Sequence, residues 1–493
     1  MTVVNPNSIS GITSITMPSG GDNVLTIHTN DGTERFRIDS SGNVKIGTAA
    51  TISPDGDLFV TGVCTATTLS GAASGLTGAL PAISAASLTN VPAANVVGVH
   101  TSLTVTNATT TGTAVVGGGV TISESGIEAS GIGITVANIN GTQIGGRRNL
   151  VINGAMQVAE RASSSDVSST AYGSVDRFQL EVAGLDNAVT MAQVNVSSGT
   201  TPYTEGFRKA LKLTNGDQTS VGNTDTMRIL YKFEGQDIAQ SGWNHKSSSS
   251  FITLSFWIKS SVAQSFKVSL ISWDGSSRTF VFDTGSLSAD TWTKVTKTIP
   301  GDSNVTVDND NANGFQISFY QYLGTNYTDS GYTENVWGAY QNPQTPDQTN
   351  TWYDTNDATY ELTGVQLEVG PQATPFEHRS FQEEREMCRR YYHAIIGTMG
   401  SWGSAVAYST QNAQGWYSIH PEMRSAPTFT WTGTLKLEDG AAAYTTTNTT
   451  AATTMGTHGF SWWMGGFSGL TDNNVYYVYE SGQTGYFQLD AEL

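Results

Sequence analysis

Aromatic residues beside short polar residues are the side chains of this chain best suited to binding a ligand. The apolar face of a sugar ring packs on a tryptophan or tyrosine ring, while Asp, Asn and Gln bond its hydroxyl groups. Such residues in turns predict a glycan-binding surface, although any single aromatic residue belongs more often to a core or an interface. The candidate residues are Trp273, Asp274, Trp337, Trp352, Tyr353, Trp416, Tyr417, Trp462 and Trp463.

Oxygen ligands for a metal ion gather in residues 308–314, which read DNDNANG. This segment resembles a calcium-binding loop, but it lacks the glutamate that the EF-hand pattern has at its twelfth position. A polar turn ahead of a strand is therefore the favoured interpretation, and Asp308 and Asp310 are the candidate ligands of the alternative, a metal site. The histidines are scattered without the spacing of a zinc site, so no cofactor is predicted.

Carboxylates could also serve a glycoside hydrolase, which needs two of them roughly 5–9 Å apart. The chain has 42 acidic residues, so pairs are expected in any case. It contains neither a Walker loop nor a G-x-S-x-G nucleophile motif. We therefore expect a protein that is not an enzyme, with a polysaccharide depolymerase as an alternative.

The composition favours an all-β, elongated protein of several domains. Only 13% of the 493 residues are charged, and 53 glycines favour short strands and turns. The formal net charge of −18 argues against nucleic acid or an anionic membrane surface as a partner. No segment is long and apolar enough for membrane insertion, and the first residues lack the pattern of a signal peptide.

Residues 49–146 contain no Lys, Arg, Trp or Tyr, and Phe59 is their one aromatic residue. Such a composition cannot bury enough apolar surface for an ordinary monomeric core. Short alternating runs, such as Val120 and Ile122, recur between glycines and predict an oligomeric β shaft in which several chains share one core. The alternative is a disordered linker. Ahead of the shaft, residues 1–48 predict an attachment segment and a β-meander.

Two further β regions follow the shaft. Residues 147–376 contain strands with two-residue periodicity, such as 252–258 and 315–319, and predict an antiparallel β-sandwich. Residues 397–493 are rich in aromatic residues and predict a small β tip domain. We expect this tip to be intertwined between chains, because its aromatic surface would otherwise leave a large exposed patch.

Residues 377–396 predict the one helix of the chain, as a joint between the two β regions. Ser380 and Glu383 form a capping box at its start. An incomplete apolar stripe follows at roughly helical spacing, sufficient for a narrow seam between like helices of several chains. Its residues are Phe381, Cys388, Tyr391 and Ile395.

Several stretches resemble bacteriophage tail fibre proteins, particularly those of marine, cyanophage-type phages. They are DSSGNVKIG at residues 39–47, RRNLVINGAMQV at 147–158, VQLEVGPQATPFEHRSFQEEREMCRRYY at 365–392, and PEMRSAPTF at 421–429 together with DAEL at 490–493. Separately, the strand SFWIKSS at residues 255–261, with the segments TWTKVTKTI and YELTGVQLE, resembles a jelly-roll carbohydrate-binding module.

The resemblance implies a homotrimeric fibre in the virion tail, made in the host cytoplasm and held by its N-terminal end to a tail or adaptor protein. Its distal domains would contact bacterial surface polysaccharide or lipopolysaccharide, and the helical seam would become a threefold collar. The resemblance transfers no binding residue, because the binding loops of sugar-binding modules differ between members. A connector or decoration fibre without receptor binding remains an alternative.

Overall fold

The structure is a computed structural model that describes residues 24–47, 50–61, 114–116, 120–123, 126–129, 147–396, 403–446, 451–480 and 486–493. The chain divides into two compact units, residues 1–111 and 112–493, and each is described by itself. Antiparallel sheets dominate the described residues, so the prediction of an all-β fold is confirmed. The predicted attachment segment and most of the predicted shaft lie outside the described residues. Among the described residues, no helix has the length and apolar character needed to span a membrane.

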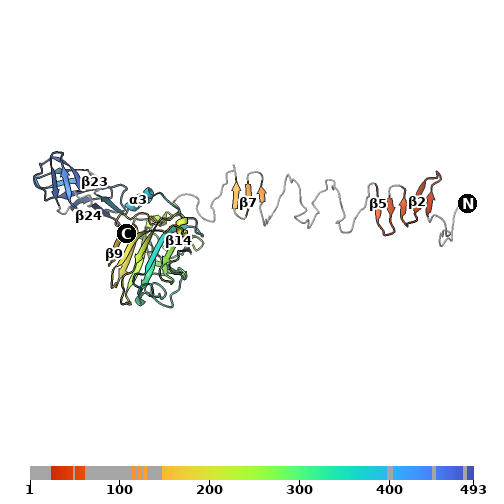
Figure 1. Ribbon diagram of the computed structural model, residues 1–493, viewed down its shortest axis with the longest axis horizontal. Helices are drawn as coiled ribbons and strands as arrows, with labels where there is room; N and C mark the ends of the chain where they lie inside the picture. Colours follow the sequence, from red (N-terminus) through yellow and green to blue (C-terminus); the bar gives the residue numbers. More distant parts are fainter. Residues whose placement is uncertain are drawn as a thin grey trace. The chain divides into compact units, whose positions relative to one another are not determined.

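The first unit contains a five-stranded antiparallel meander (Figure 1). Its strands are β1 (Leu25–His28), β2 (Glu34–Ile38), β3 (Val44–Ile46), β4 (Ala50–Ile52) and β5 (Leu58–Val60). The turn between β2 and β3 forms because the Asp39 carboxylate accepts the amides of Ser41 and Asn43. The predicted domain boundary at residue 48 falls inside this sheet, because Ile46 pairs with Ala50.

The second unit begins with the small sheet β6 (Ala114–Val116), β7 (Val120–Ser123) and β8 (Gly126–Ala129), followed by a β-sandwich. One sandwich sheet, the β13 sheet, has the order β10 (Phe178–Ala183), β13 (Thr226–Glu234), β18 (Asn313–Leu323), β15 (Lys267–Ser272), β16 (Arg278–Asp283) and β19 (Trp337–Ala339). The other, the β14 sheet, has the order β17 (Thr293–Pro300), β14 (Phe251–Ser260), β20 (Thr359–Val369), β12 (Lys209–Thr214), β11 (Val189–Asn195) and β9 (Ser164–Val167). Two short helices, α1 (Thr201–Thr204) and α2 (Gly235–Ala239), lie in the connections.

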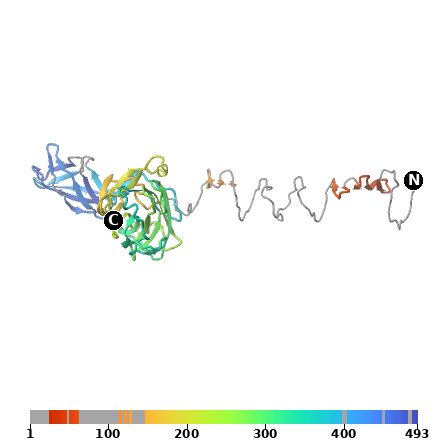
Figure 2. The same ribbon diagram turned by 60° about the horizontal axis from the view of Figure 1, so that its bottom comes forward.

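The sandwich core lies between these two sheets (Figures 1 and 2). Alternate residues of β14, including Leu254 and Phe256, belong to this core and meet buried residues of the facing sheet such as Phe319. Burying each large apolar side chain stabilises the fold by about 1.5–3 kcal/mol. The two-residue periodicity predicted for these strands is therefore confirmed, and the chain crosses between the sheets repeatedly, as in a jelly roll.

Helix α3 (Phe381–Arg389) follows the sandwich, and both hydrogen bonds of the predicted capping box are present. The helix is shorter than predicted, because residues 392–396 form strand β21 (Tyr392–Ile396) instead. Ile395 lies opposite Phe487 of strand β30 (Tyr486–Asp490). The aromatic and β-branched residues of this segment favour a strand, and the partner strand comes from a part of the chain far away in sequence.

The C-terminal strands form two more sheets. Strands β21, β30 and β24 (Thr428–Thr432) make a three-stranded sheet. The seven-stranded tip sheet has the order β26 (Ala443–Thr446), β25 (Leu435–Glu438), β29 (Val475–Glu480), β22 (Ser404–Ala407), β23 (Ala413–Ser418), β28 (Gly459–Met464) and β27 (Ala451–Met455). Aromatic residues such as Trp462, Tyr476 and Phe487 are buried within the one chain, and others, such as Phe429 and Trp431, are half-buried against the same core. Intertwining between chains stays a prediction.

Candidate functional site

Two of the predicted glycan-binding residues, Trp352 and Tyr353, lie in the sandwich core. Both are fully buried. The indole Nε1 of Trp352 donates to the Thr359 carbonyl at 3.0 Å, and the Tyr353 hydroxyl donates to Asp225 at 3.2 Å. The prediction of glycan contact is wrong at both positions, because their rings fill the core and protein groups already bond their polar atoms.

Trp337 and Trp462 are buried as well, and the prediction is wrong for them for the same reason. Trp337 donates to the Pro300 carbonyl at 2.7 Å. Trp462 packs across Gly415, where an added Cβ would lie 1.9 Å from the indole. Tyr417 is half-buried and packs against the core of the tip. None of these rings forms part of an exposed platform.

Trp273 and Asp274 lie at one end of the sandwich, next to the predicted metal segment. An Asp274 carboxylate oxygen accepts the amide of Asp308 at 2.7 Å. Burial raises the pKa of Asp274, and the charges of Asp308 and Asp310 act in the same direction. Within the part of the chain that the structure describes, no three acidic, histidine or cysteine side chains could hold a metal ion. The Trp273 ring packs edge-on against Tyr340 instead of lying open, with ring centroids 4.8 Å apart.

The two remaining residues, Trp416 and Trp463, lie on the outer face of the tip sheet. The alternation of buried and exposed residues along its strands sets this arrangement, since Trp462 and Tyr476 point into the core and their neighbours point outward. We call this surface the tip face. Its residues are Ser404, Val406, Gln414, Trp416, Lys436, Glu438, Ser461, Trp463, Val475, Tyr477 and Tyr479.

Two rings dominate the tip face, because 65% of Trp416 and 59% of Tyr477 are exposed. Tyr477 lies opposite Ser404 of β22, and β22 separates it from Trp416 on β23. Neighbouring strands are about 4.8 Å apart, so the backbone positions that carry the two rings are about 10 Å apart. The Trp416 indole extends over Gly459, where no side chain stands. Both rings therefore remain available to a ligand that bridges them.

A second row on the same face is more apolar. Val475 lies opposite Val406, Val406 opposite Gln414, and Gln414 opposite Trp463. Both valines are exposed. The tip face therefore combines an aromatic row that contains hydroxyl groups with an apolar row that contains one amide.

The charges of the tip face cancel. The ammonium group of Lys436 lies 2.9 Å from the Glu438 carboxylate and 5.7 Å from the centre of the Tyr479 ring. Glu438 is the one carboxylate among the tip-face residues defined above, so this described surface holds no pair of carboxylates for hydrolysis. Its chemistry is ring stacking and neutral hydrogen bonding.

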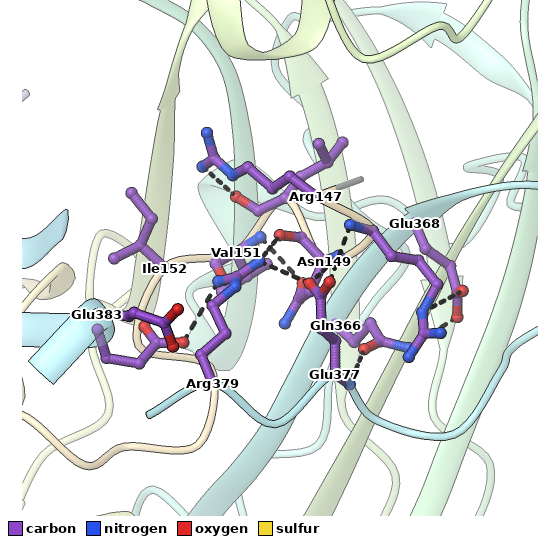
Figure 3. Close-up of polar contacts among 12 residues, drawn as sticks. Arg147, Asn149, Val151, Ile152, Gln366, Glu368, Glu377, Arg379 and Glu383 are labelled. Carbon is purple, nitrogen blue, oxygen red and sulfur yellow. Dashed lines mark hydrogen bonds and ion pairs between the residues drawn. The ribbon is translucent and has the colours of Figure 1, made fainter. Parts of the chain in front are cut away.

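A separate polar network joins the start of the sandwich to the segment ahead of α3 (Figure 3). The Asn149 side chain donates to the Val365 carbonyl and accepts the Leu367 amide, at 3.2 and 3.1 Å. The Glu377 carboxylate accepts the amides of Arg148 and Asn149, at 3.2 and 2.8 Å. Partial burial alone would raise the pKa of Glu377, but these amides, together with the Arg379 guanidinium, outweigh it and lower that pKa.

Nearby polar residues of the sandwich bond the end of α3 and the C-terminal residues. Glu234, which is buried, accepts two hydrogen bonds from Arg390 at 2.7 and 2.8 Å and one from the Tyr391 hydroxyl at 2.7 Å. Arg177 pairs with Glu492. Residues of the stretches that begin at 147, 365, 421 and 490 therefore meet here in a structural junction.

The predicted collar is wrong for three of its four residues, because their side chains are used within one chain. Cys388, a free thiol, and Tyr391 are buried against Ile152 and Val158 of the sandwich, and Ile395 is buried in the core of the tip. Burial raises the pKa of the Cys388 thiol well above its ordinary value. Phe381 is exposed and remains available to a partner.

Sequence reasoning missed Tyr477, although the sequence contains the signal. In the segment VYYVYE of β29, Tyr476 and Val478 are buried, so the alternation places Tyr477 and Tyr479 on the opposite face. The junction pair Arg177 and Glu492 was also missed, and no local pattern predicts it, because the two residues lie 315 positions apart.

No protein-family model matches the chain, and no curated protein matches its sequence. Among solved structures, the chain is similar to the enzymatically active domain of tailspike protein 4 from bacteriophage CBA120, at a TM-score of 0.24 and 11% identity over 45% of this chain and 21% of that one. It is also similar to the CBM22-1 and GH10 modules of an endo-1,4-β-D-xylanase from Clostridium thermocellum. The TM-score is 0.21 and the identity is 9%, over 44% of this chain and 29% of that one.

A third similar structure is the N-terminal cellulose-binding domain of β-1,4-glucanase C from Cellulomonas fimi, at a TM-score of 0.21 and 12% identity over 40% of this chain and 90% of that one. The chain spans 21% of the tailspike domain and 29% of the xylanase modules. Similarities of this size carry no conclusion about function.

Proposed function

We propose that this protein is a non-enzymatic, homotrimeric tail fibre of a bacteriophage virion that binds a surface glycan of its bacterial host through the tip face. Its N-terminal end would attach to a tail or adaptor protein. The observation that carries the proposal is the exposure of Trp416 and Tyr477 on one face, in a tip where most of the other described aromatic rings lie in the core or pack against it.

Exposing two large rings has an energetic cost that binding can recover. A large apolar side chain gains about 1.5–3 kcal/mol on burial. A planar ring can bind the apolar face of a sugar, while the Ser404 hydroxyl and the Gln414 amide lie beside the rings and can bond sugar hydroxyls. Each site would bind weakly, but three sites on one fibre can raise avidity by roughly 10²–10⁴.

The cancelled charges of the tip face favour a neutral glycan segment. Lys436 and Glu438 neutralise one another, and the other tip-face residues are uncharged. With a formal net charge of −18, the chain would also repel a strongly anionic polymer. Binding should therefore depend little on salt.

The test is a binding assay with the full chain and a panel of soluble polysaccharides, some neutral, such as dextran, galactomannan and β-glucan, and some anionic, such as alginate. Lipopolysaccharide and capsule preparations complete the panel. If a ring contact contributes about 1 kcal/mol, Trp416→Ala or Tyr477→Ala weakens monovalent binding about fivefold. Phe381→Ala, an exposed ring on α3, is the matched control and should leave binding unchanged.

Two results would overturn the proposed binding site. One is the absence of binding to every polymer in the panel, and the other is binding that survives replacement of both rings. Oligosaccharides released from a bound polymer during long incubation would contradict the non-enzymatic part of the proposal. That outcome would favour a depolymerase instead.

The exposed valines favour a second candidate, in which the tip face contacts protein and the fibre is a connector or decoration without receptor binding. Val406 and Val475 together form an apolar patch of the kind found at protein interfaces. Mass measurement separates the two candidates. A change of oligomeric state in Trp416→Ala favours the interface, whereas loss of glycan binding at constant mass favours the receptor role.

A further inference from the structure

One face of the first unit's sheet is apolar across all five strands. Residues directly opposite one another in an antiparallel pair point to the same face. The strand register gives two apolar rows that cross the sheet. Each row takes one residue from each strand, and the two rows lie two residues apart along the strands, so they share one face. The rows are Leu25, Ile38, Val44, Ile52 and Leu58, and Ile27, Phe36, Ile46, Ala50 and Val60. We call this surface the shaft face.

The opposite face of the sheet is mostly polar. It carries Arg37, Lys45 and Thr51, which lie between the shaft-face residues along their strands. Arg37 pairs with Glu34 at 2.6 Å and Lys45 with Asp39 at 3.3 Å. Phe59 is an exception, as an exposed ring on this side. The charged face is therefore expected to contact solvent, and the shaft face is expected to contact an apolar partner.

The shaft face has no covering layer within the described part of the first unit. None of residues 24–47 and 50–61 is buried, and Ile27, Ile46 and Leu58 are more than half exposed. A single layer of strands of three to five residues, without a buried residue, is not expected to be stable in water by itself. Its apolar face needs a partner.

The pairing pattern favours further copies of this chain as that partner. In the sheet of β6 to β8, alternate pairs again join apolar residues, such as Ile122 with Ile127 and Val116 with Val120. A different protein would have to match both of these separate sheets. Identical chains aligned in register match both automatically, since each sheet meets its own copy.

The small size of the shaft face also favours further copies of this chain as the partner. Five strands at about 4.8 Å span only about 24 Å. A contact of two such small sheets is well below the roughly 800 Å² that each partner contributes to a stable standard interface. The contact must therefore be supplemented by equivalent contacts elsewhere along the same pair of chains, which copies in register provide.

We infer that the shaft face packs against the shaft faces of further copies of this chain, so that β1 to β5 of each chain form one side of a shared core. The inference names the surface through which the fibre proposed above assembles, and it rests on that proposal. In the assembly, Ile52 and Val44 point toward the shared core and Thr51 and Lys45 toward solvent.

Crosslinking of the full chain tests this arrangement, in a Cys64→Ser background that leaves the buried Cys388 as the one native thiol. Ile52→Cys should give a covalent product between chains with a short bis-maleimide. Thr51→Cys, its neighbour on the opposite face of the same strand, should give none. Equal crosslinking at the two positions, or no crosslinking at either, overturns the inference.

A second pair of variants tests the contact with the crosslinking position held constant. Ile52→Asp places carboxylates in the apolar core and should lower the crosslinking yield of Ile46→Cys by about tenfold or more, because burying a charge in apolar contact is costly. Thr51→Asp should leave that yield unchanged, and equal effects of the two aspartates overturn the inference. Glycan binding by the same samples is scored separately. Binding without crosslinking overturns the shaft contact alone, and crosslinking without binding overturns the receptor role alone.

Discussion

The pair of Arg177 and Glu492 decides how firmly the C-terminal strands are held to the sandwich. The Arg177 and Glu492 side chains are 1% and 4% exposed. The second guanidinium nitrogen donates to the Lys232 carbonyl at 2.7 Å, and the guanidinium lies 3.3 Å from the centre of the Tyr391 ring. Burial opposes the charge of Arg177, but Glu492 outweighs it and holds the arginine pKa well above its ordinary value.

Removing one partner of a buried ion pair leaves an uncompensated charge, which costs about 3–5 kcal/mol. We therefore expect Arg177→Met to lower the free energy of unfolding by that amount, measured by urea unfolding of the full chain. Glu492→Met should cost less, because the stranded arginine keeps its bond to the Lys232 carbonyl and its contact with Tyr391. Arg208→Met, at an exposed arginine, is the control and should change stability by less than about 1 kcal/mol.

The double variant tests whether the two side chains act as one pair. If the two side chains form one buried pair, Arg177→Met with Glu492→Met should cost less than the sum of the single changes by about 1–3 kcal/mol, since no buried charge is left unpaired. Costs that simply add would refute the reasoning. They would mean that the C-terminal strands are not held to the sandwich through this pair.

Three further predictions follow from single residues. Burial raises the pKa of Asp176 to about 7, so between the unfolded value of about 4 and that value the folded chain binds a proton that the unfolded chain does not. Stability should therefore fall by up to about 4 kcal/mol as the pH rises from 4 to 7, and Asp176→Asn should abolish this fall in unfolding experiments across that range. Gly415→Ala should lower the free energy of unfolding by about 1–3 kcal/mol or more, since its Cβ would lie 1.9 Å from the Trp462 ring. Ser380→Ala should cost about 1 kcal/mol and speed hydrogen exchange in the first turn of α3, because it removes the capping box.

Two of these predictions have matched controls. Asp166 is exposed, so Asp166→Asn should keep the pH dependence of the parent chain. An unchanged pH dependence in Asp176→Asn would contradict the assignment to Asp176. An added Cβ at Gly338 meets nothing within 4 Å, so Gly338→Ala should change stability by less than about 0.5 kcal/mol.

Local sequence patterns predicted the parts of the fold that depend on local physics. The alternation in residues 252–258 and 315–319 reflects strands with one face in the core, and both strands are present. The capping box at Ser380 and Glu383 depends on two residues one turn apart, and it is present as well. Such features need no knowledge of the rest of the chain.

The candidate site was predicted only in part, because exposure depends on partners distant in sequence. Trp352 and Trp416 stand in similar polar surroundings in the sequence, yet the first fills the sandwich core and the second lies open on the tip face. The stripe from Phe381 to Ile395 was apolar as predicted. Its buried members pack against the sandwich and the tip of their own chain, which a helical pattern alone cannot distinguish from a partner chain.

The most direct test of the tip face as a glycan site is fluorine NMR of the full chain labelled with 5-fluorotryptophan. The Trp416 resonance is assigned by its loss in Trp416→Phe, and that of the buried Trp352 in the same way. On addition of oligosaccharides cut from the polysaccharide that binds best, the Trp416 resonance should shift in a saturable manner while that of Trp352 stays in place. Saturable binding that leaves the Trp416 resonance unmoved would contradict the account.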